Sequence, residues 1–253
     1  MRDDGAGPES GGAAWPPEAF LARLRDVGQR RYHDRHPFHR RMNEGRLTPT
    51  QLRGWVANRF HYQRSIPVKD AAILSNCPLP DVRRVWVRRL HDHDGTPDGP
   101  GGIEAWLRVA EAVGLTREEV WGGRHLLPGV RFAVEAYMQF ARSRPWPIAV
   151  ASSLTELFAP DLMAERLAAF ERHYTWVPYW GLDYFRARLT QARRDAEHAL
   201  ELTLEHCTTI ELQREAVAAL EFKCDVLWAM LDAMALQYGG GEDSWLAATE
   251  VGQ

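Results

Sequence analysis

The last long apolar stretch of the chain, residues 209–238, has the spacing of a helix that packs on a core. Apolar side chains recur every three or four residues, at Val217, Leu220, Cys224, Leu227, Leu231, Met234 and Tyr238. More apolar residues lie off this stripe, and Asp232 carries the only charge between residues 226 and 236. A helix that is apolar on nearly every side is enclosed by other elements. The pattern therefore predicts that this helix forms the centre of a helical bundle.

The remaining chain also has helical periodicity, and no stretch alternates with the period of a strand. Capping-box spacing occurs at Thr48-x-x-Gln51, Thr116-x-x-Glu119 and Thr208-x-x-Glu211. Helices are predicted near residues 17–31, 37–44, 49–65, 80–93, 102–114, 129–142, 147–158, 161–171, 179–206 and 209–238. Closely spaced breaks without an internal repeat favour one all-α domain over residues 15–238. A disordered extension is expected at 1–14 and a tail at 239–253.

Polar side chains occupy positions where three of these helices should be apolar. Arg59 does so in one helix, Arg89 and His93 in a second, and Tyr184 and Arg188 begin a polar stripe in a third. Each has an ordinary explanation, because an arginine can reach water at a bundle rim, a core histidine can be hydrogen-bonded, and a polar stripe can be solvated. Repetition on three helices instead indicates an interior pocket for a polyanionic, ring-shaped ligand.

The lysine content adds to this interpretation. Only Lys69 and Lys223 are lysines among the 31 basic residues, and Lys223 lies on the most apolar helix. A lysine retained in so arginine-rich a chain is expected where a compact ammonium with a shiftable pKa is needed. Chance survival explains the count equally well.

Charge and composition exclude several classes of function. The net charge of −3 argues against nucleic-acid binding, and no uncharged apolar run reaches the roughly 20 residues of a membrane span. The first residues lack the apolar segment of a signal peptide, so a cytoplasmic location is expected. Three cysteines without CxxC spacing predict neither a disulfide framework nor a zinc site.

Long strings of this sequence resemble the PqqC family of pyrroloquinoline-quinone synthases over about residues 17–238. They are YH at 32–33 with HP at 36–37, WVANRF at 55–60, IPVKDAAILSNCP at 66–78, DHDG at 92–95, GIEAWL at 102–107, LPGVRFAV at 127–134, SSLTELFAP at 152–160, QARRDAEH at 191–198 and FKCDVLWAMLDAM at 222–234. The resemblance implies a haem-oxygenase-like seven-helix bundle, six helices around a buried one, assembled as a homodimer. It implies no metal or organic cofactor.

The resemblance also implies a reaction in which a carboxylate-rich bicyclic quinone closes a third ring. Successive deprotonations then pass electrons to the co-substrate O₂, which leaves as H₂O₂. Substrate-binding roles fall on Tyr32, Arg59, Gln63, Lys69, Arg89, Tyr137, Glu156 and Arg166. His93 is expected to act as the base with His33 assisting, because imidazole titrates near working pH. Tyr184, Arg188 and Lys223 are expected to stabilise or protonate oxygen anions.

One position departs from the family pattern. Where the family places a histidine in the oxygen-handling group, this chain has Met163. A thioether neither donates a proton nor stabilises an oxyanion. Ring closure is therefore expected to survive, while the later oxidations slow or stop early.

Two other functions remain open at the level of sequence. A metal-dependent or thiaminase-like enzyme on the same bundle would use glutamate and histidine ligands on facing helices. The only comparable spacings are Asp195-x-x-His198 and Glu197 with Glu201. The loss of a histidine at Met163 also allows a non-catalytic carrier that binds the quinone for hand-off.

Overall fold

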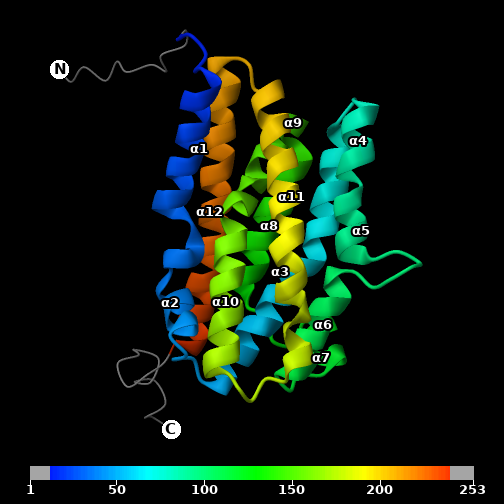
Figure 1. The fold of residues 1–253 in the computed structure, drawn as a ribbon, viewed down its shortest axis with the longest axis vertical. Helices are drawn as coiled ribbons and strands as arrows, with labels where there is room; N and C mark the ends of the chain where they lie inside the picture. The colour runs from blue at the N-terminus through cyan, green and yellow to red at the C-terminus, as the bar shows by residue number, and fades with distance from the viewer. Residues whose placement is uncertain (1–11, 240–253) are drawn as a thin grey trace, which may run out of the picture.

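The computed structural model describes residues 12–239 as a bundle of helices that run roughly along one axis (Figure 1). Its α-helices are α1 (Pro17–Arg31), α2 (Pro37–Asn43), α3 (Pro49–Asn76), α4 (Pro80–Trp86), α5 (Arg88–Asp94), α6 (Gly102–Ala112), α7 (Arg117–Trp121), α8 (Pro128–Ser143), α9 (Trp146–Ala151), α10 (Ala159–His173), α11 (Asp183–His206) and α12 (Ile210–Tyr238). Three 3₁₀ segments are η1 (His33–Arg35), η2 (Ser152–Phe158) and η3 (Tyr179–Leu182). No strand occurs between residues 12 and 239, which confirms the all-α prediction.

The most enclosed helix is α3, over residues 51–67, and not α12 as the apolar pattern predicted. No residue of α3 between Gln51 and Pro67 is exposed, and α3 packs against α5, α6, α8 and α12. By contrast, Asp225, Ala229 and Asp232 of α12 are exposed, so one face of α12 reaches the surface. The sequence pattern missed α3 because several of its buried residues are polar.

Several helix boundaries also differ from the predicted ones. The helix predicted to end at residue 65 continues to Asn76 through Pro67, and the stretch predicted as one helix over 147–158 divides into α9 and η2. The Thr48 and Thr116 capping boxes form as predicted, but Thr209 rather than Thr208 caps α12. Its hydroxyl oxygen accepts a hydrogen bond from the backbone N–H of Leu212 at 3.3 Å.

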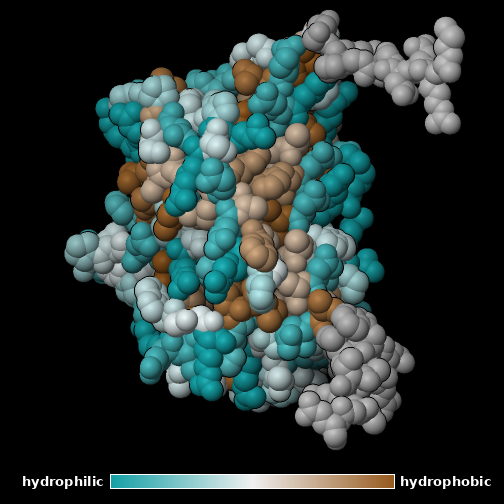
Figure 2. Space-filling view, turned by 180° about the vertical axis from the view of Figure 1, so that it is seen from behind, coloured by the Kyte–Doolittle hydropathy of each residue, from teal (hydrophilic) through white to brown (hydrophobic). Residues whose placement is uncertain are grey.

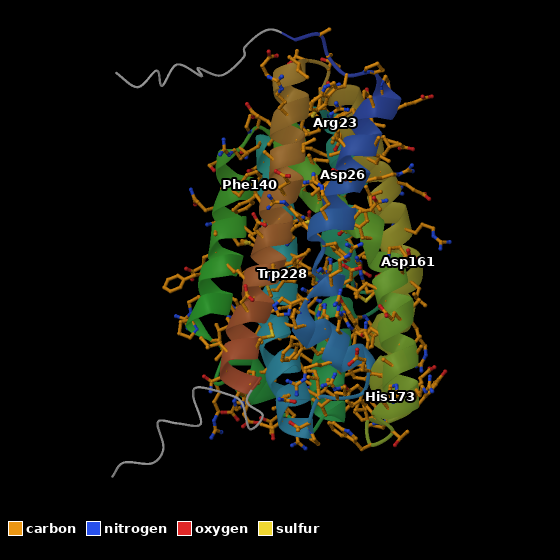
Figure 3. The ribbon with its side chains drawn as sticks, turned by 90° about the vertical axis from the view of Figure 1, so that its left-hand side faces the viewer. Arg23, Asp26, Phe140, Asp161, His173 and Trp228 are labelled. Carbon is orange, nitrogen blue, oxygen red and sulfur yellow. The ribbon has the colours of Figure 1, made fainter. Side chains whose placement is uncertain are left out.

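The predicted extension and tail lie almost entirely outside the described residues. Within residues 12–239, none of the helices combines the length and apolar character needed to cross a membrane. Cys77, Cys207 and Cys224 are buried and form no disulfide, in agreement with the sequence analysis. The buried apolar side chains form one continuous core, and Figure 3 shows side chains filling the space between the helices.

Candidate active site

Helices α3, α5, α10, α11 and α12, together with η1 and η2, enclose a cavity of about 50 Å³ inside the bundle. Nine of the residues proposed from sequence line it: Tyr32, His33, Arg59, Gln63, His93, Glu156, Met163, Tyr184 and Arg188. A neighbouring cavity of about 10 Å³ shares His33 and Arg59 with the first, and Arg166 lines it as well. The structure therefore brings ten proposed residues from six segments of the chain to one place.

The other four proposed residues lie behind the cavity wall rather than in it. They are Lys69, Arg89, Tyr137 and Lys223. Arg89 donates to the lining residue Glu156 at 2.5 Å, and Lys223 donates to the hydroxyl of Tyr62, another lining residue, at 2.8 Å. These four residues therefore lie next to the cavity without lining it.

Two of these cations are neutralised by internal carboxylates. Lys69 Nζ lies 2.6 Å from Asp70 Oδ1, which is also 3.4 Å from Arg89 Nε and accepts a hydrogen bond from the indole of Trp86. Burial alone would raise the pKa of Asp70, but Lys69 and Arg89 together hold that pKa below its usual value. Asp70 was not proposed from sequence, although this residue directly follows Lys69 in the IPVKDAAILSNCP segment.

A second carboxylate, Asp195, which was considered from sequence only as a possible metal ligand, faces two arginines of the site. Its Oδ2 lies 3.6 Å from Arg188 Nη1 and 3.9 Å from Arg89 Nη1, so it pairs with both without a hydrogen bond to either. Its Oδ1 accepts from Arg194, which also donates to Asp92 on α5. Asp195 therefore ties α11 to α5. Its position on the polar stripe of the α11 sequence was the signal for it.

Three cations of the site have no carboxylate within 4.0 Å among the residues that the structure describes: Arg59, Arg166 and Lys223. Arg166 instead contacts His39 at 3.2 Å and stacks over the ring of Trp55, while its Nε has no partner. Burial, followed by repulsion from Arg59, lowers the pKa of Arg166 to about 10. A buried cation without a counter-ion is costly, so this arrangement favours an anionic ligand.

The histidines of the site are neutral. Burial and then Arg188 lower the pKa of His93 to about 3, and burial and then Arg59 hold the pKa of His33 well below its usual value. The Nδ1 atoms of both rings are buried and unpartnered. Neutral imidazoles with a free nitrogen can accept a proton, and an anion bound beside the cations would bring their pKa values up towards working pH.

Met163 on α10 lies in the same cavity as Tyr184 and Arg188, as the sequence analysis expected. It is buried, and its thioether leaves this part of the wall without an ionisable group. Tyr184 is held in place by an edge-to-face contact with Trp106, whose ring centroid is 4.7 Å away. The Tyr184 hydroxyl and the Arg188 guanidinium are thus the polar groups that α11 presents beside the Met163 thioether.

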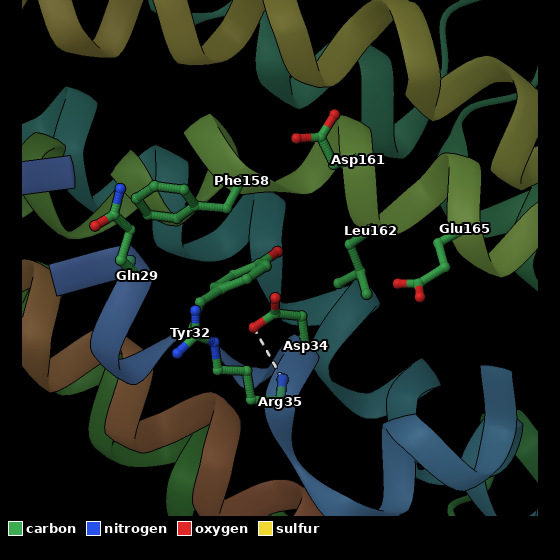
Figure 4. Close-up of a pocket in the computed structure, with 9 residues that line it drawn as sticks. Gln29, Tyr32, Asp34, Arg35, Phe158, Asp161, Leu162 and Glu165 are labelled. Carbon is green, nitrogen blue, oxygen red and sulfur yellow. Dashed lines mark hydrogen bonds between the residues drawn. The ribbon is translucent and has the colours of Figure 1, made fainter. Parts of the chain in front are cut away.

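An outer depression of about 400 Å³ lies beside the cavity, between α1, η1 and the start of α10 (Figure 4). Tyr32 and Leu162 line both the depression and the cavity, so they form the wall between the two. The ring of Phe158 lies 5.3 Å from that of Tyr32 and fills the space over Gly28. The depression is larger than the cavity, but Arg35 is the one cation in its described lining, whereas Arg59 and Arg188 line the cavity.

Sequence comparison finds the profile of the TENA/THI-4/PQQC family over residues 21–233. A pyrroloquinoline-quinone synthase of Pseudomonas aeruginosa is 58% identical over 226 residues, covering 89% of this chain and 90% of its own. Those of Cronobacter sakazakii and Acinetobacter baylyi are 56% and 54% identical over 222 residues each, covering 88% of this chain and 88% and 87% of their own.

Structural comparison finds the predicted fold. A domain of unknown function with a heme oxygenase-like fold from Shewanella denitrificans has a TM-score of 0.71 at 16% identity, covering 90% of this chain and 95% of its own. A TenA homolog from Pseudomonas syringae has a TM-score of 0.68 at 15% identity, covering 88% and 98%. At these identities the likeness concerns the fold alone, and it confirms the haem-oxygenase-like bundle.

Proposed function

This chain belongs to the TENA/THI-4/PQQC family, and we propose that it is a pyrroloquinoline-quinone synthase that closes the last ring of the quinone and oxidises it with O₂. The observation that carries the proposal is a group of three cations that have no carboxylate partner among the described residues and that lie in or beside a histidine-lined cavity. Arg166 and Lys223 are buried, and Arg59 is half-buried. A quinone with several carboxylates supplies the missing counter-charges. The identity of 54–58% to three such synthases supports the same conclusion.

In this proposal the cations hold the substrate. Arg59 and Arg166 bind carboxylates directly, because guanidinium groups pair with carboxylates in a fixed geometry. Gln63, whose Oε1 is buried without a partner, orients a polar group of the substrate. Lys69 and Arg89 act through the carboxylates that they contact, by keeping Glu156 and its neighbours in position.

Proton removal from carbon falls to His93, with His33 assisting. The substrate amine adds to the quinone ring and closes the third ring, after which a base removes carbon-bound protons. The electron pairs left behind pass to O₂, and each O₂ takes up two electrons and two protons and leaves as H₂O₂. Arg188 stabilises the oxygen anions and Tyr184 donates to them, as preorganised donors do in other enzymes.

The cavity is too small for the substrate as it stands. A bound tricyclic quinone needs a site of at least about 300 Å³, several times the present cavity. Side chains in the wall must therefore move, and Tyr32 and Leu162 are placed to do so because they separate the cavity from the outer depression. We propose that the substrate reaches the site from that depression.

We further propose that the reaction needs no resident metal or organic cofactor. Over residues 12–239, no three histidine, cysteine or carboxylate side chains are arranged to hold a metal ion. Activity should then persist in a chelator. Iron bound at one or two equivalents per chain, with activity following the iron, would favour the metal-dependent alternative.

The test of the function is aerobic mixing of the purified protein with the quinone precursor, followed by mass and absorbance of the product. We expect O₂ uptake, H₂O₂ release and an absorbance change in the metal-free protein. Arg59→Ala should abolish these, while Arg30→Ala, at an exposed pair on α1, should not. Tight binding without O₂ uptake would instead support the carrier alternative.

A homodimer and a cytoplasmic location complete the proposal. Apolar residues gather on the face of the bundle shown in Figure 2, the side on which Phe140 of α8 lies in Figure 3. Phe132 of α8 and Leu236 of α12 are exposed, and Phe140 and Phe222 line a groove of about 270 Å³. A second copy of the chain would cover these side chains. Light scattering of the purified protein should give twice the mass of one chain.

A further inference from the structure

Tyr62 on α3 lines the cavity, but none of the roles described above uses it. Its ring lies between two cations: Arg59 is 4.2 Å and Lys223 is 4.1 Å from the ring centroid. Its hydroxyl oxygen is 2.8 Å from Lys223 Nζ. Because Lys223 does not itself line the cavity, Tyr62 separates this ammonium from the space where substrate binds.

The direction of the hydrogen bond between them follows from the groups involved. An ammonium donates and never accepts, so the Tyr62 hydroxyl oxygen is the acceptor and keeps its own hydrogen for another partner. Among the described residues, that hydroxyl donates no hydrogen bond to another side chain or to the backbone. Its hydrogen is therefore available to a ligand in the cavity.

The acidities of the two groups suit a relay. Burial raises the pKa of Tyr62 well above its usual value, and the neighbouring Tyr137 raises it further, so the Tyr62 phenol stays protonated. Burial, followed by Arg59 and Lys69, lowers the pKa of Lys223 well below its usual value, which makes the ammonium a stronger acid. A proton passed from Lys223 through Tyr62 never requires a free phenolate.

We propose that Tyr62 is a catalytic proton donor that passes a proton from Lys223 to an oxygen of the substrate; this rests on the proposed function. The Tyr62 O–H bond breaks as an O–H bond forms on the reduced quinone oxygen, and a Lys223 N–H bond breaks as the Tyr62 O–H bond is restored. The relay moves no electrons, since the substrate carbons supply them to O₂. Solvent returns a proton to Lys223 when the site opens.

The relay has a particular consequence in this chain. Met163 removes one proton donor from the cavity. The tyrosine hydroxyls that remain along its described wall are those of Tyr32, Tyr62 and Tyr184. Tyr32 has a pKa raised by burial and belongs to the outer wall. Tyr62 alone among the three is hydrogen-bonded to an ammonium that can resupply it.

The test is Tyr62→Phe, which removes the hydroxyl and keeps the ring between the two cations. Pyrroloquinoline quinone, followed by its absorbance, should bind with an affinity within about threefold of wild type, because one neutral hydrogen bond is lost. The protonation-dependent phase of a single aerobic turnover should slow at least tenfold, within the range of general acid catalysis. The absorption maximum of the bound quinone should also shift towards that of the free compound.

Tyr238→Phe is the matched control. Its hydroxyl contacts Asn58, one turn before Tyr62 on α3, and does not line the cavity. We expect wild-type binding and rates. Equal losses of binding and rate in Tyr62→Phe would show a positioning role and overturn the relay, as would an unchanged rate. Failure of the wild-type protein to bind or convert any quinone would instead refute the proposed function itself.

Incorporation of 3-fluorotyrosine at position 62 keeps the test open if Tyr62→Phe does not fold. The fluorine makes the phenol more acidic and preserves its hydrogen bond. The more acidic phenol gives up its proton more readily, so the protonation-dependent phase should be faster than in wild type. The titratable and charged groups facing Tyr62 are Lys223 on α12, Tyr137 on α8, Arg59 on α3, Glu156 on η2 and Tyr184 on α11. An unchanged rate would contradict proton transfer by Tyr62.

Discussion

At the scale of single residues, charge pairing divides the cations of the site into two groups with different duties. Lys69, Arg89 and Arg188 have internal carboxylates within 4.0 Å, so their charges are balanced before any ligand arrives. Arg59, Arg166 and Lys223 have none among the described residues, and the two buried ones, Arg166 and Lys223, destabilise the unliganded fold. Affinity for a carboxylate-rich quinone should therefore come mainly from the second group.

Replacing Arg166 by methionine tests this division. Arg166→Met removes a buried, unbalanced charge and keeps most of the volume, so the free energy of unfolding of the unliganded protein should rise by roughly 1 kcal/mol or more. Binding of pyrroloquinoline quinone should weaken by roughly 2–5 kcal/mol, the usual cost of losing one partner of a buried charge pair. Urea unfolding and an absorbance titration measure the two effects. Arg84→Met, at an exposed pair, is the control and should change neither. Lower stability together with unchanged affinity would show that Arg166 is structural.

Met163→His tests the departure from the family pattern. Under the proposed mechanism the wild-type protein should bind substrate, close the ring and accumulate a partly oxidised intermediate, because Met163 supplies no proton where the resemblance implies a histidine. Met163→His should speed the later O₂-consuming steps by up to the roughly 10²–10⁴-fold that a general acid supplies. Affinity should change little, since the two side chains are similar in size. Single-turnover absorbance in air compares the proteins. Identical rates to the fully oxidised quinone would exclude this role for position 163.

At the scale of elements, α3 combines burial with polar function. It carries Arg59, Tyr62, Gln63 and Lys69 on 28 residues, and Pro67 lies inside it between the last two. Proline has no N–H to donate to the carbonyl of Gln63 four residues earlier, and its ring crowds that carbonyl. The two halves of the helix can thus present their side chains in directions that a straight helix would not allow.

Pro67→Ala should straighten this region. The restored hydrogen bond should raise the free energy of unfolding by up to about 3 kcal/mol. Affinity for pyrroloquinoline quinone should fall, because Arg59 and Gln63 turn relative to Lys69. Calorimetry and an absorbance titration measure both. Pro80→Ala, at the first position of α4 where no helical hydrogen bond is missing, should leave both nearly unchanged. A stabilised protein with wild-type affinity would show that the proline has no part in shaping the site.

At the scale of the whole molecule, buried neutral histidines link stability to pH. His33, His39 and His93 have pKa values lowered first by burial, so the native state does not take up protons at pH 5 to 6. In the unfolded chain the same rings titrate near pH 6.5. Their contribution to stability is therefore complete above about pH 6.5 and is lost progressively as the pH falls below it.

Urea unfolding at pH 7 and pH 5 should reveal this linkage. Each of these histidines should cost up to about 2 kcal/mol of stability by pH 5. His39→Asn, which removes one ring outside the main cavity, should make the loss smaller by about a third. Bound pyrroloquinoline quinone should also flatten the profile, because its carboxylates favour protonated histidines nearby. Equal stability at the two pH values would mean that the histidines are protonated in the native state.

Sequence by itself determined the helical class, most helix positions and the residue types of the site. Apolar periodicity is a local property, and capping residues such as Thr48 act within one turn, so both can be followed along the chain. Polar residues in apolar stripes likewise indicated a pocket. The segments that resemble the PqqC family extended the prediction to a family, and the haem-oxygenase-like fold that they implied is confirmed.

Only the tertiary structure decided which helix is enclosed, which cations are balanced and which residues reach the cavity. Apolar periodicity shows how apolar a helix is, so it indicated α12 rather than α3 as the enclosed helix. Several buried residues of α3 are polar, and they weaken its apolar pattern. Charge pairing depends on side chains brought together from different helices, as Arg188 and Asp195 are brought to Glu156 and Arg89. For the same reason no local pattern could show that Tyr62 stands between Lys223 and the cavity, because that arrangement exists only once α3 and α12 are packed side by side.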